Sequence, residues 1–266
     1  MYYTRKSGII LNIPDFRVCR MLYLKSRYCY EGRYSMENNP TINAVCITAD
    51  IIASRESGKD KELPQVVHFL NEKYDGKCIT MFTKRMGDEI FGILADFSDA
   101  YWVLKDLFTL SIQKALPLYV GIGFGVVKKD NKHHVHDVNG TAIWNSADAL
   151  KVLKENDQSV KYFQNEASTF RYFYKANNRN VPHMLINYMT ALIFDKVQNR
   201  TQKQAEVIAT VEKFPSLNLE AIGKKIGYEQ NAGLNVSKTL RRAEYHFVRD
   251  AELELILLLE HIQKAR

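Results

Sequence analysis

The sequence lacks the signals of several large protein classes. None of its apolar runs approaches the roughly 20 residues that a membrane-spanning helix needs. Only four of its 266 residues are cysteines, and they show no Cys-X-X-Cys spacing, so a disulfide scaffold is not predicted. The apolar segment 9–13 is too short for a secretory signal peptide. We therefore expect a cytoplasmic protein with free thiols and no membrane partner.

An excess of positive over negative charge is also nearly absent outside the N-terminus. The net charge of +7 comes from 37 basic and 30 acidic residues. Residues 1–35 hold seven of the basic side chains and two of the acidic ones, whereas 36–200 and 201–266 are each nearly neutral. A protein that coats nucleic acid by bulk charge alone is therefore not expected. The composition, 46% hydrophobic and 25% charged, is that of a globular protein.

Residues 1–40 are interpreted as a basic N-terminal extension. They combine Tyr, Arg and Ser without a clear hydrophobic period, and a polar stretch at 37–40 precedes the first strong element. The segment is either a basic arm or an extension upstream of a natural start at Met36. We favour the second interpretation.

From residue 42 onward the pattern alternates between strands and helices. Strands are predicted at 43–52, 77–83, 89–94, 117–127 and 160–163, and helices at 63–74, 98–114 and 141–153. No strand is predicted after Gln164, and the aromatic residues between 162 and 174 are interpreted as a clamp between domains. We predict an α/β domain with antiparallel pairing at 41–165, a connecting helix at 166–200 and an all-helical domain at 201–266.

Two aspartates mark a candidate site in the first domain. Asp50 lies within the apolar strand 43–52, and Asp88 lies at the tip of a hairpin. A buried carboxylate is costly unless it is paired, hydrogen-bonded or bound to a cation. Two carboxylates on neighbouring strands form an oxygen site that suits Mg²⁺, which in turn holds nucleotide phosphates. Basic residues from the same edge are expected to complement phosphate charge: Arg55, Lys84 and Arg85. The alternative is that Asp50 caps the strand and Asp88 makes the turn.

Four segments follow one another along this domain: TADIIASR (48–55), RMGDEIF (85–91), VGIGFG (120–125) and NGTAIWNSADAL (139–150). Together they resemble the palm-type domain of nucleotide cyclases, a group that includes the GGDEF diguanylate cyclases and the adenylyl cyclases. Over about 42–250 the chain resembles the SatD family, small bacterial proteins with a C-terminal helix-turn-helix. The resemblance implies an α+β fold: a ferredoxin-like, nucleotide-cyclase-type palm with an antiparallel sheet, followed by an all-α helix-turn-helix domain.

The resemblance also implies roles for individual residues. It assigns Asp50 and Asp88 to the metal positions, with Mg²⁺ and a nucleotide as ligands. The implied nucleotide-binding residues are Ile51, Arg55, Arg85, Gly87 and Asn145. The chain departs from the pattern at Met86, where the GGDEF hairpin has its first Gly, and at Trp144, where cyclases place a catalytic Asn. The metal half of the site is thus retained and the transition-state half lost, which favours binding over catalysis.

The second domain has the pattern of a helix-turn-helix. A capping box at Thr201–Gln204 opens a first helix, and further helices are predicted at 219–227 and 235–245. A core stripe of apolar residues is expected on the third helix and just beyond it: Val236, Leu240, Ala243 and Phe247. The residues expected to meet phosphates and base edges of DNA lie on another side: Ser237, Lys238, Arg241 and Arg242.

The predicted helix-turn-helix has an irregular turn, and a different interpretation of its three helices is open. The turn at 228–234 is longer than usual. The alternative is a three-helix packing module with a solvated basic face. Beyond it, the apolar helix predicted at 248–262 needs a partner surface, either the first domain or its own copy in a homodimer.

Two further motifs are discounted. The glycine run 121–125 lies within a strand pattern and is not followed directly by a helix, so it is not interpreted as a phosphate loop. The histidines at 133, 134 and 136 lie in a polar stretch that is interpreted as a solvent-exposed loop.

We therefore expect a cytoplasmic bacterial regulator that couples a nucleotide- and Mg²⁺-binding domain to a DNA-binding helix-turn-helix. The alternative is a nucleotide cyclase or nucleotidyltransferase-type enzyme that uses Asp50 and Asp88. A third hypothesis is a non-catalytic scaffold in which both domains bind proteins.

Overall fold

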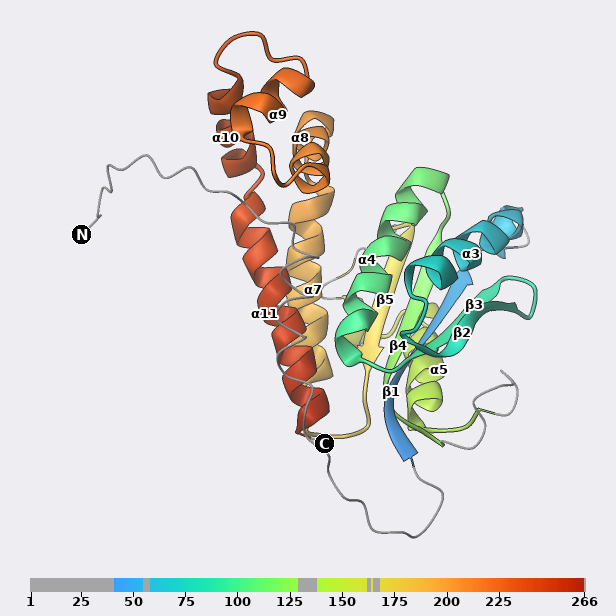
Figure 1. The fold of residues 1–266 in the computed structure, drawn as a ribbon. Helices are drawn as coiled ribbons and strands as arrows, with labels where there is room; N and C mark the ends of the chain where they lie inside the picture. The colour runs from blue at the N-terminus through green and yellow to red at the C-terminus, as the bar shows by residue number, and fades with distance from the viewer. Residues whose placement is uncertain (1–40, 55–57, 129–137, 162–163, 165–167, 266) are drawn as a thin grey trace. The chain divides into compact units, whose positions relative to one another are not determined.

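The computed structural model describes residues 41–54, 58–128, 138–161, 164 and 168–265 (Figure 1). Contacts divide the described chain into two compact units. The sheet unit comprises the described residues up to 192 together with 252–265, and the helical unit comprises 193–251. The segment 252–265 thus groups with the sheet, whereas the sequence analysis assigned it to the helical domain. The N-terminal extension and the histidine loop lie outside the described residues.

The sheet unit is α+β, with a mixed five-stranded sheet in the order β2-β3-β1-β4-β5. Its strands are β1 (Thr41–Ile51), β2 (Cys78–Arg85), β3 (Glu89–Leu94), β4 (Leu118–Lys128) and β5 (Phe170–Lys175). β1 lies in the middle and pairs antiparallel with β3 and β4, and β2 pairs antiparallel with β3. β5 pairs parallel with β4, so the prediction of an antiparallel sheet is wrong at this edge.

The strand β5 was not predicted from the sequence. Its first five residues are all buried, so polar and apolar residues do not alternate, and the aromatic run was mistaken for a clamp. Tyr174 stacks on Phe124 of β4, with ring centroids 5.7 Å apart, and so belongs to the core of the sheet unit. The strand predicted at 160–163 is also wrong where it is described, because Gln158–Lys161 forms the short helix α6.

Helices cover both faces of the sheet. The 3-10 turn η1 (Lys59–Glu62) leads into α3 (Leu63–Lys73), and α4 (Phe97–Lys114) follows β3. On the face covered by α4, Phe97 packs against Phe124, with ring centroids 4.8 Å apart. On the other face lies α5 (Thr141–Lys154), whose Ser146 hydroxyl is hydrogen-bonded to that of Thr48 in β1.

The glycines of β4 allow α5 to pack very closely on the sheet. A Cβ atom at Gly123 would meet the Ala142 carbonyl and the Ser146 amide of α5, and one at Gly121 would meet the Ser146 carbonyl. The glycine run therefore lies within β4, as the strand pattern predicts, and serves helix packing. This close approach brings the C-terminal end of α5 to the end of β1, where Asp50 lies.

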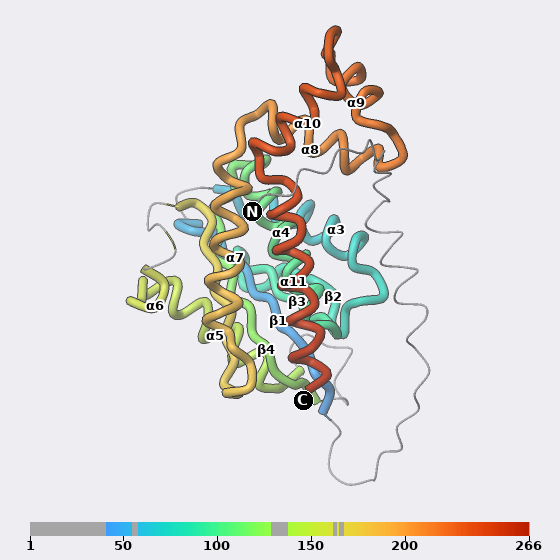
Figure 2. The backbone as a smooth tube through the Cα atoms, turned by 90° about the vertical axis from the view of Figure 1, so that its left-hand side faces the viewer, coloured from blue at the N-terminus to red at the C-terminus, as the bar shows by residue number. Residues whose placement is uncertain are grey.

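Two long helices, α7 (His183–Gln198) and α11 (Tyr245–Lys264), contribute residues to both units. Within the sheet unit, the part of α11 from Glu252 onward packs on α4 (Figure 2). The Tyr101 hydroxyl donates to the Glu252 carboxylate at 2.7 Å, and the Phe97 amide donates to Gln263 Oε1 at 2.8 Å. Of the two partner surfaces considered for the apolar C-terminal helix, the structure shows the first domain for the part from Glu252 onward. A homodimer through this helix remains a prediction.

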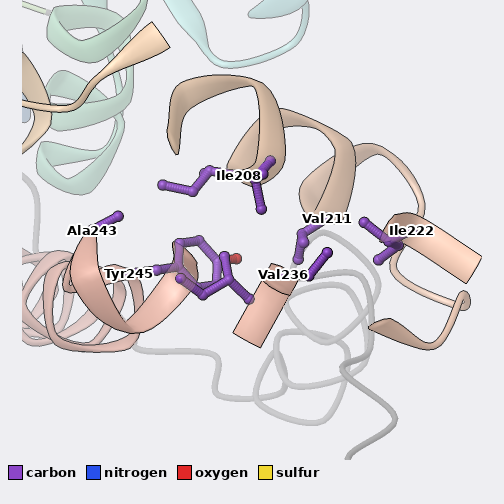
Figure 3. Packing of buried hydrophobic residues seen from close by; sticks show 8 residues of the cluster. Ile208, Val211, Ile222, Val236, Ala243 and Tyr245 are labelled. Atoms are coloured by element: carbon purple, nitrogen blue, oxygen red, sulfur yellow. The ribbon is translucent and has the colours of Figure 1, made fainter. Parts of the chain in front are cut away.

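Three short helices form the centre of the helical unit: α8 (Gln202–Lys213), α9 (Leu219–Lys225) and α10 (Ala232–Arg242). The predicted capping box is confirmed, because the Thr201 and Gln204 side chains each accept a hydrogen bond from the other residue's backbone amide. The helices and the start of α11 enclose an apolar core (Figure 3) of Val207, Ile208, Val211, Ile222, Val236, Leu240, Ala243 and Tyr245.

The connection between α9 and α10 is shorter than predicted. Gly227 has the expected positive φ of 87°, but α10 begins at Ala232, three residues before the predicted start at Asn235. Glu220 of α9 explains the early start, because its carboxylate accepts a hydrogen bond from the Gly233 amide in the first turn of α10 at 2.7 Å. At the other end α10 stops at Arg242, and the register therefore changes before Phe247. That residue is 65% exposed, so its prediction as a core residue is wrong.

The two described cysteines, Cys46 and Cys78, are free thiols as expected. Burial raises the pKa of both thiols to about 11. They are therefore protonated and weakly nucleophilic at neutral pH. Cys19 and Cys29 lie outside the described residues.

Replacing Gly123 with Ala is expected to destabilise the protein by about 1–3 kcal/mol, because the new methyl group meets the backbone of α5, which cannot rotate away. The matched variant is Gly92→Ala, whose methyl group meets the ring of Phe82. We expect a smaller loss there because a side chain adjusts more easily than a helix. Urea unfolding of both variants measures the difference, and equal losses would contradict the packing role of Gly123.

Candidate functional site

A row of polar residues crosses the sheet near one end. Asp50 of β1 lies opposite Glu89 of β3 and Tyr119 of β4. Beyond these, Arg85 lies opposite Glu89, and Arg171 lies beside Tyr119. Side chains that face each other across strands lie on the same face of a sheet, here the face that α5 covers. The row therefore places charged groups of both signs next to one another beneath the end of α5.

Asp50 is the central member of this row and is only 8% exposed. Its carboxylate forms an ion pair with the ammonium group of Lys154, the last residue of α5. The Lys154 side chain itself is about half exposed, at 49%. A largely buried carboxylate thus has a cation beside it that also reaches solvent, which satisfies the requirement that buried charges be paired.

Asp50 and Asp88 line the same pocket, which has a volume of about 390 Å³. Lys154 and Tyr119 form part of its wall, and the chain that leaves β1 forms another part, residues 51–54. The sequence predicts that the two carboxylates lie close together, and both residues line this pocket. The pocket therefore combines two carboxylates, an ammonium group and a phenol.

Two turns at the pocket contain residues with left-handed backbone. Ala53 has a φ of 52° after β1, and in the hairpin Met86 and Gly87 have φ values of 51° and 92°. This conformation costs a residue with a Cβ atom roughly 1–2 kcal/mol, whereas Gly adopts it freely. Met86 therefore occupies a position that favours Gly, and its side chain is 87% exposed.

The two carboxylates of the pocket suit Mg²⁺ only when other groups supply the rest of its ligands. Among the described residues, no cluster of three or more His, Cys, Asp and Glu side chains exists that would enclose an ion. Mg²⁺ nevertheless binds through one or two carboxylates when waters and substrate phosphates supply its other ligands. Asp50 and Asp88 therefore suit an ion that arrives with a phosphate group.

The other residues proposed to bind nucleotide lie in different surroundings. Ile51 lines the pocket, although its side chain is buried. Arg85 does not line the pocket: its Nε donates to Glu89 at 2.6 Å, and its guanidinium lies over the Phe91 ring at 4.3 Å. Gly87 lies in the hairpin turn beside Asp88. Arg55 lies outside the described residues.

Asn145 does not reach the pocket. Its side chain is 1% exposed and donates to the Phe124 carbonyl at 2.7 Å, so it anchors α5 to β4. The neighbouring Trp144 is 58% exposed and does not line the pocket either. The two positions that resemble the catalytic part of a cyclase site are thus both away from Asp50 and Asp88.

Lys154 and Tyr119 are pocket residues that the sequence analysis did not assign. The sequence does indicate an unusual position for Lys154, because this residue continues the otherwise apolar helix face of Ile143, Ala147 and Leu150. A lysine at such a position is expected where a helix end covers a buried carboxylate. Tyr119 had no such signal, because tyrosine is common in strands.

The proposed DNA-binding residues all lie on one exposed side of the helical unit. Ser237, Lys238, Arg241 and Arg242 are exposed on α10, and Val236 and Leu240 of the same helix are buried. In the described chain the three basic side chains have no carboxylate partner. Their charges are therefore available to an external anion.

Comparisons with protein-family models, curated proteins and solved structures found no match to this chain. Within the described residues, no helix is both long and apolar enough to cross a membrane.

Replacing Met86 with Gly is expected to raise the free energy of unfolding by about 1 kcal/mol. The relief of left-handed strain, roughly 1–2 kcal/mol, exceeds the entropy that Gly loses on folding, roughly 0.5–1 kcal/mol. The control is Met81→Gly, at a half-exposed methionine within β2, where Gly is expected to destabilise. Urea unfolding measures both, and a destabilised Met86→Gly variant would show that the side chain contributes more than its strain costs.

Proposed function

We propose that this chain is a regulatory protein whose sheet unit binds a nucleotide together with Mg²⁺ and whose helical unit binds DNA. One observation carries the proposal for the sheet unit: Asp50, Asp88 and Lys154 line a single pocket. The carboxylates supply the oxygen ligands that Mg²⁺ prefers, and the ammonium group complements the phosphates that the ion bridges.

The order of elements supports a ferredoxin-like palm domain of the nucleotide-cyclase type. From β1 to β4 the chain runs β1-α3-β2-β3-α4-β4, and these strands have the order β2-β3-β1-β4 with antiparallel pairing. A ferredoxin-like sheet has this order, and nucleotide-cyclase-type palm domains are built on it. We therefore propose the palm domain that the resemblance to the SatD family implies, with β5 added at the edge of its sheet.

The ion pair between Lys154 and Asp50 affects how a metal ion can bind at the proposed site. Its ammonium group occupies the carboxylate oxygen that a metal ion would need. A metal that binds Asp50 must displace Lys154, and the phosphates that accompany the ion offer the ammonium group a new partner. Free Mg²⁺ lacks this compensation. We propose that Lys154 moves from Asp50 to the phosphates when the nucleotide binds.

The burial of Asn145 weighs against the enzymatic alternative. Its amide supports α5, and the exposed Trp144 occupies the position of the expected catalytic residue. A nucleotide cyclase or nucleotidyltransferase would need a further group to stabilise the transition state. Incubation of the protein with nucleoside triphosphates and Mg²⁺ or Mn²⁺ tests this alternative, and a product that Asp50→Asn abolishes would establish it.

The three-helix arrangement of α8, α9 and α10 supports a helix-turn-helix. The helix that follows the turn carries Ser237, Lys238, Arg241 and Arg242 on its exposed side. A recognition helix uses such residues to contact phosphates and base edges. Because the region 201–266 carries nearly equal numbers of acidic and basic residues, the proposed affinity depends on this cluster rather than on bulk charge.

Lys154→Met is expected to have opposite effects on two ligands. The affinity for Mn²⁺ alone should rise, by about fivefold, because Asp50 loses its competing cation. The affinity for a fluorescent nucleoside triphosphate with Mg²⁺ should fall, by about tenfold, because the phosphates lose a charged partner. Quenching of the Mn²⁺ resonance signal and fluorescence anisotropy measure the two affinities.

The matched control for this experiment is Lys151→Met. Lys151 is one turn earlier on α5, is more exposed, and does not line the pocket. It should leave both affinities unchanged, whereas Asp50→Asn should remove the Mg²⁺ dependence of nucleotide binding. Nucleotide binding that neither Asp50→Asn nor Lys154→Met alters would reject the pocket as the site.

The double variant Arg241→Ala with Arg242→Ala is expected to weaken binding to a random-sequence DNA duplex. Loss of two phosphate contacts should also reduce the slope of log affinity against log salt by about two. The control, Lys203→Ala with Lys224→Ala, removes the same charge from lysines on α8 and α9 that have carboxylate partners. Anisotropy measured over a range of salt concentrations compares them, and unchanged binding by the arginine variant would reject the recognition face.

A further inference from the structure

A second, larger pocket lies within the helical unit. It is a groove of about 690 Å³ between the segment that joins α8 to α9 and the segment that joins α10 to α11. Most of its lining is apolar, including Phe214, Leu217, Leu240 and Phe247. Small-molecule sites in proteins are concave, mostly apolar and about 300–1,000 Å³ in volume. The groove therefore has the size and the lining of a site for a small ligand.

Two side chains of the groove remain exposed although they are large and apolar. Phe247 is 65% exposed and Leu217 is 39% exposed, and both lie on the groove wall. An aromatic ring left in water loses the stabilisation of roughly 1.5–3 kcal/mol that its burial would contribute. Exposed apolar residues that cluster in a concavity are typical of a binding site.

The charges around the groove favour an anion. Glu244, the carboxylate in the lining, is paired with Lys196 at 2.9 Å. Arg241, which lines the same groove, has no carboxylate partner among the described residues. Near Phe214 lie two more cations, since Lys225 Nζ and Lys213 Nζ are 4.5 and 5.5 Å from the centre of its ring. The neighbourhood thus has unpaired positive charge and a neutralised carboxylate.

We propose that this groove binds a small amphipathic acid. Its apolar body lies against Phe247 and Leu217, and its carboxylate or sulfonate group pairs with Arg241. Ser237 and Arg241 belong both to the groove and to the proposed DNA-binding face. On the proposed function, the ligand and DNA therefore compete for Arg241, and the acid acts as a ligand that releases the protein from DNA.

The same charges disfavour a second copy of the chain as the occupant. A symmetric contact through the groove would bring Arg241, Lys213 and Lys225 toward their own equivalents, and like charges placed together across an interface are costly. A small acid brings the opposite charge and requires no second copy. Self-association is therefore an outcome that the experiment must separate from ligand binding.

The experiment uses the full-length protein with two probes, anilinonaphthalene sulfonate and decanoate. The sulfonate should bind with enhanced fluorescence, and decanoate should displace it while the uncharged decanol does so much less. Phe247→Ser should lower the affinity for both ligands by about tenfold or more, because apolar contact is lost. Arg241→Met should lower the affinity for decanoate by a similar factor but leave the affinity for decanol unchanged.

The matched control is Leu234→Ser. Leu234 is 52% exposed on α10 but does not line the groove, so this variant should bind both probes as the parent protein does. Circular dichroism checks that every variant keeps its helices. Unchanged probe binding by Phe247→Ser would overturn the proposal, and so would a dimer at sedimentation equilibrium that Phe247→Ser dissociates.

A final measurement separates this inference from the proposed DNA binding. Decanoate, but not decanol, should reduce the affinity of the parent protein for the DNA duplex. If the protein binds no DNA, the proposed function fails, while probe binding that depends on Phe247 and Arg241 still supports the groove site. If DNA binds and decanoate binds without reducing its affinity, the competition is overturned.

Discussion

The ion pair between Asp50 and Lys154 is the interaction on which the candidate nucleotide site depends. A carboxylate at the end of the central strand would be unstable there without a cation, because the residue is only 8% exposed. The glycines of β4 bring α5 close enough for its last residue to supply that cation. The packing of the sheet unit and the charge balance of its pocket are thus parts of one arrangement.

Elements with a clear hydrophobic period were predictable from the sequence. β1, β3, α5 and the capping box at Thr201 were found because their signals are local. β5 was missed because it is buried on all sides and pairs with a strand that is distant in the sequence. Phe247 was misplaced because the helix ends at Arg242, a break that the apolar spacing does not reveal.

The candidate site was predictable in part for the same reason. That Asp50 and Asp88 lie near each other was expected from strand adjacency, and both line one pocket. Lys154 was not assigned because its position depends on how α5 packs across β4, which is a tertiary property. Asn145 was assigned by resemblance to a motif, yet it is buried and bonded to a backbone carbonyl away from the pocket. The basic residues of α10 were predictable as exposed because Val236 and Leu240 define the opposite, buried side.

The proposed function requires that Lys154 exchange its partner when a nucleotide binds with Mg²⁺. A crystal structure of the protein with Mg²⁺ and a non-hydrolysable nucleoside triphosphate would show whether this exchange occurs. We expect Asp50 to coordinate the ion and the Lys154 ammonium group to have moved to a phosphate oxygen. A structure in which Lys154 remains on Asp50 while the nucleotide lies elsewhere would rule out the exchange.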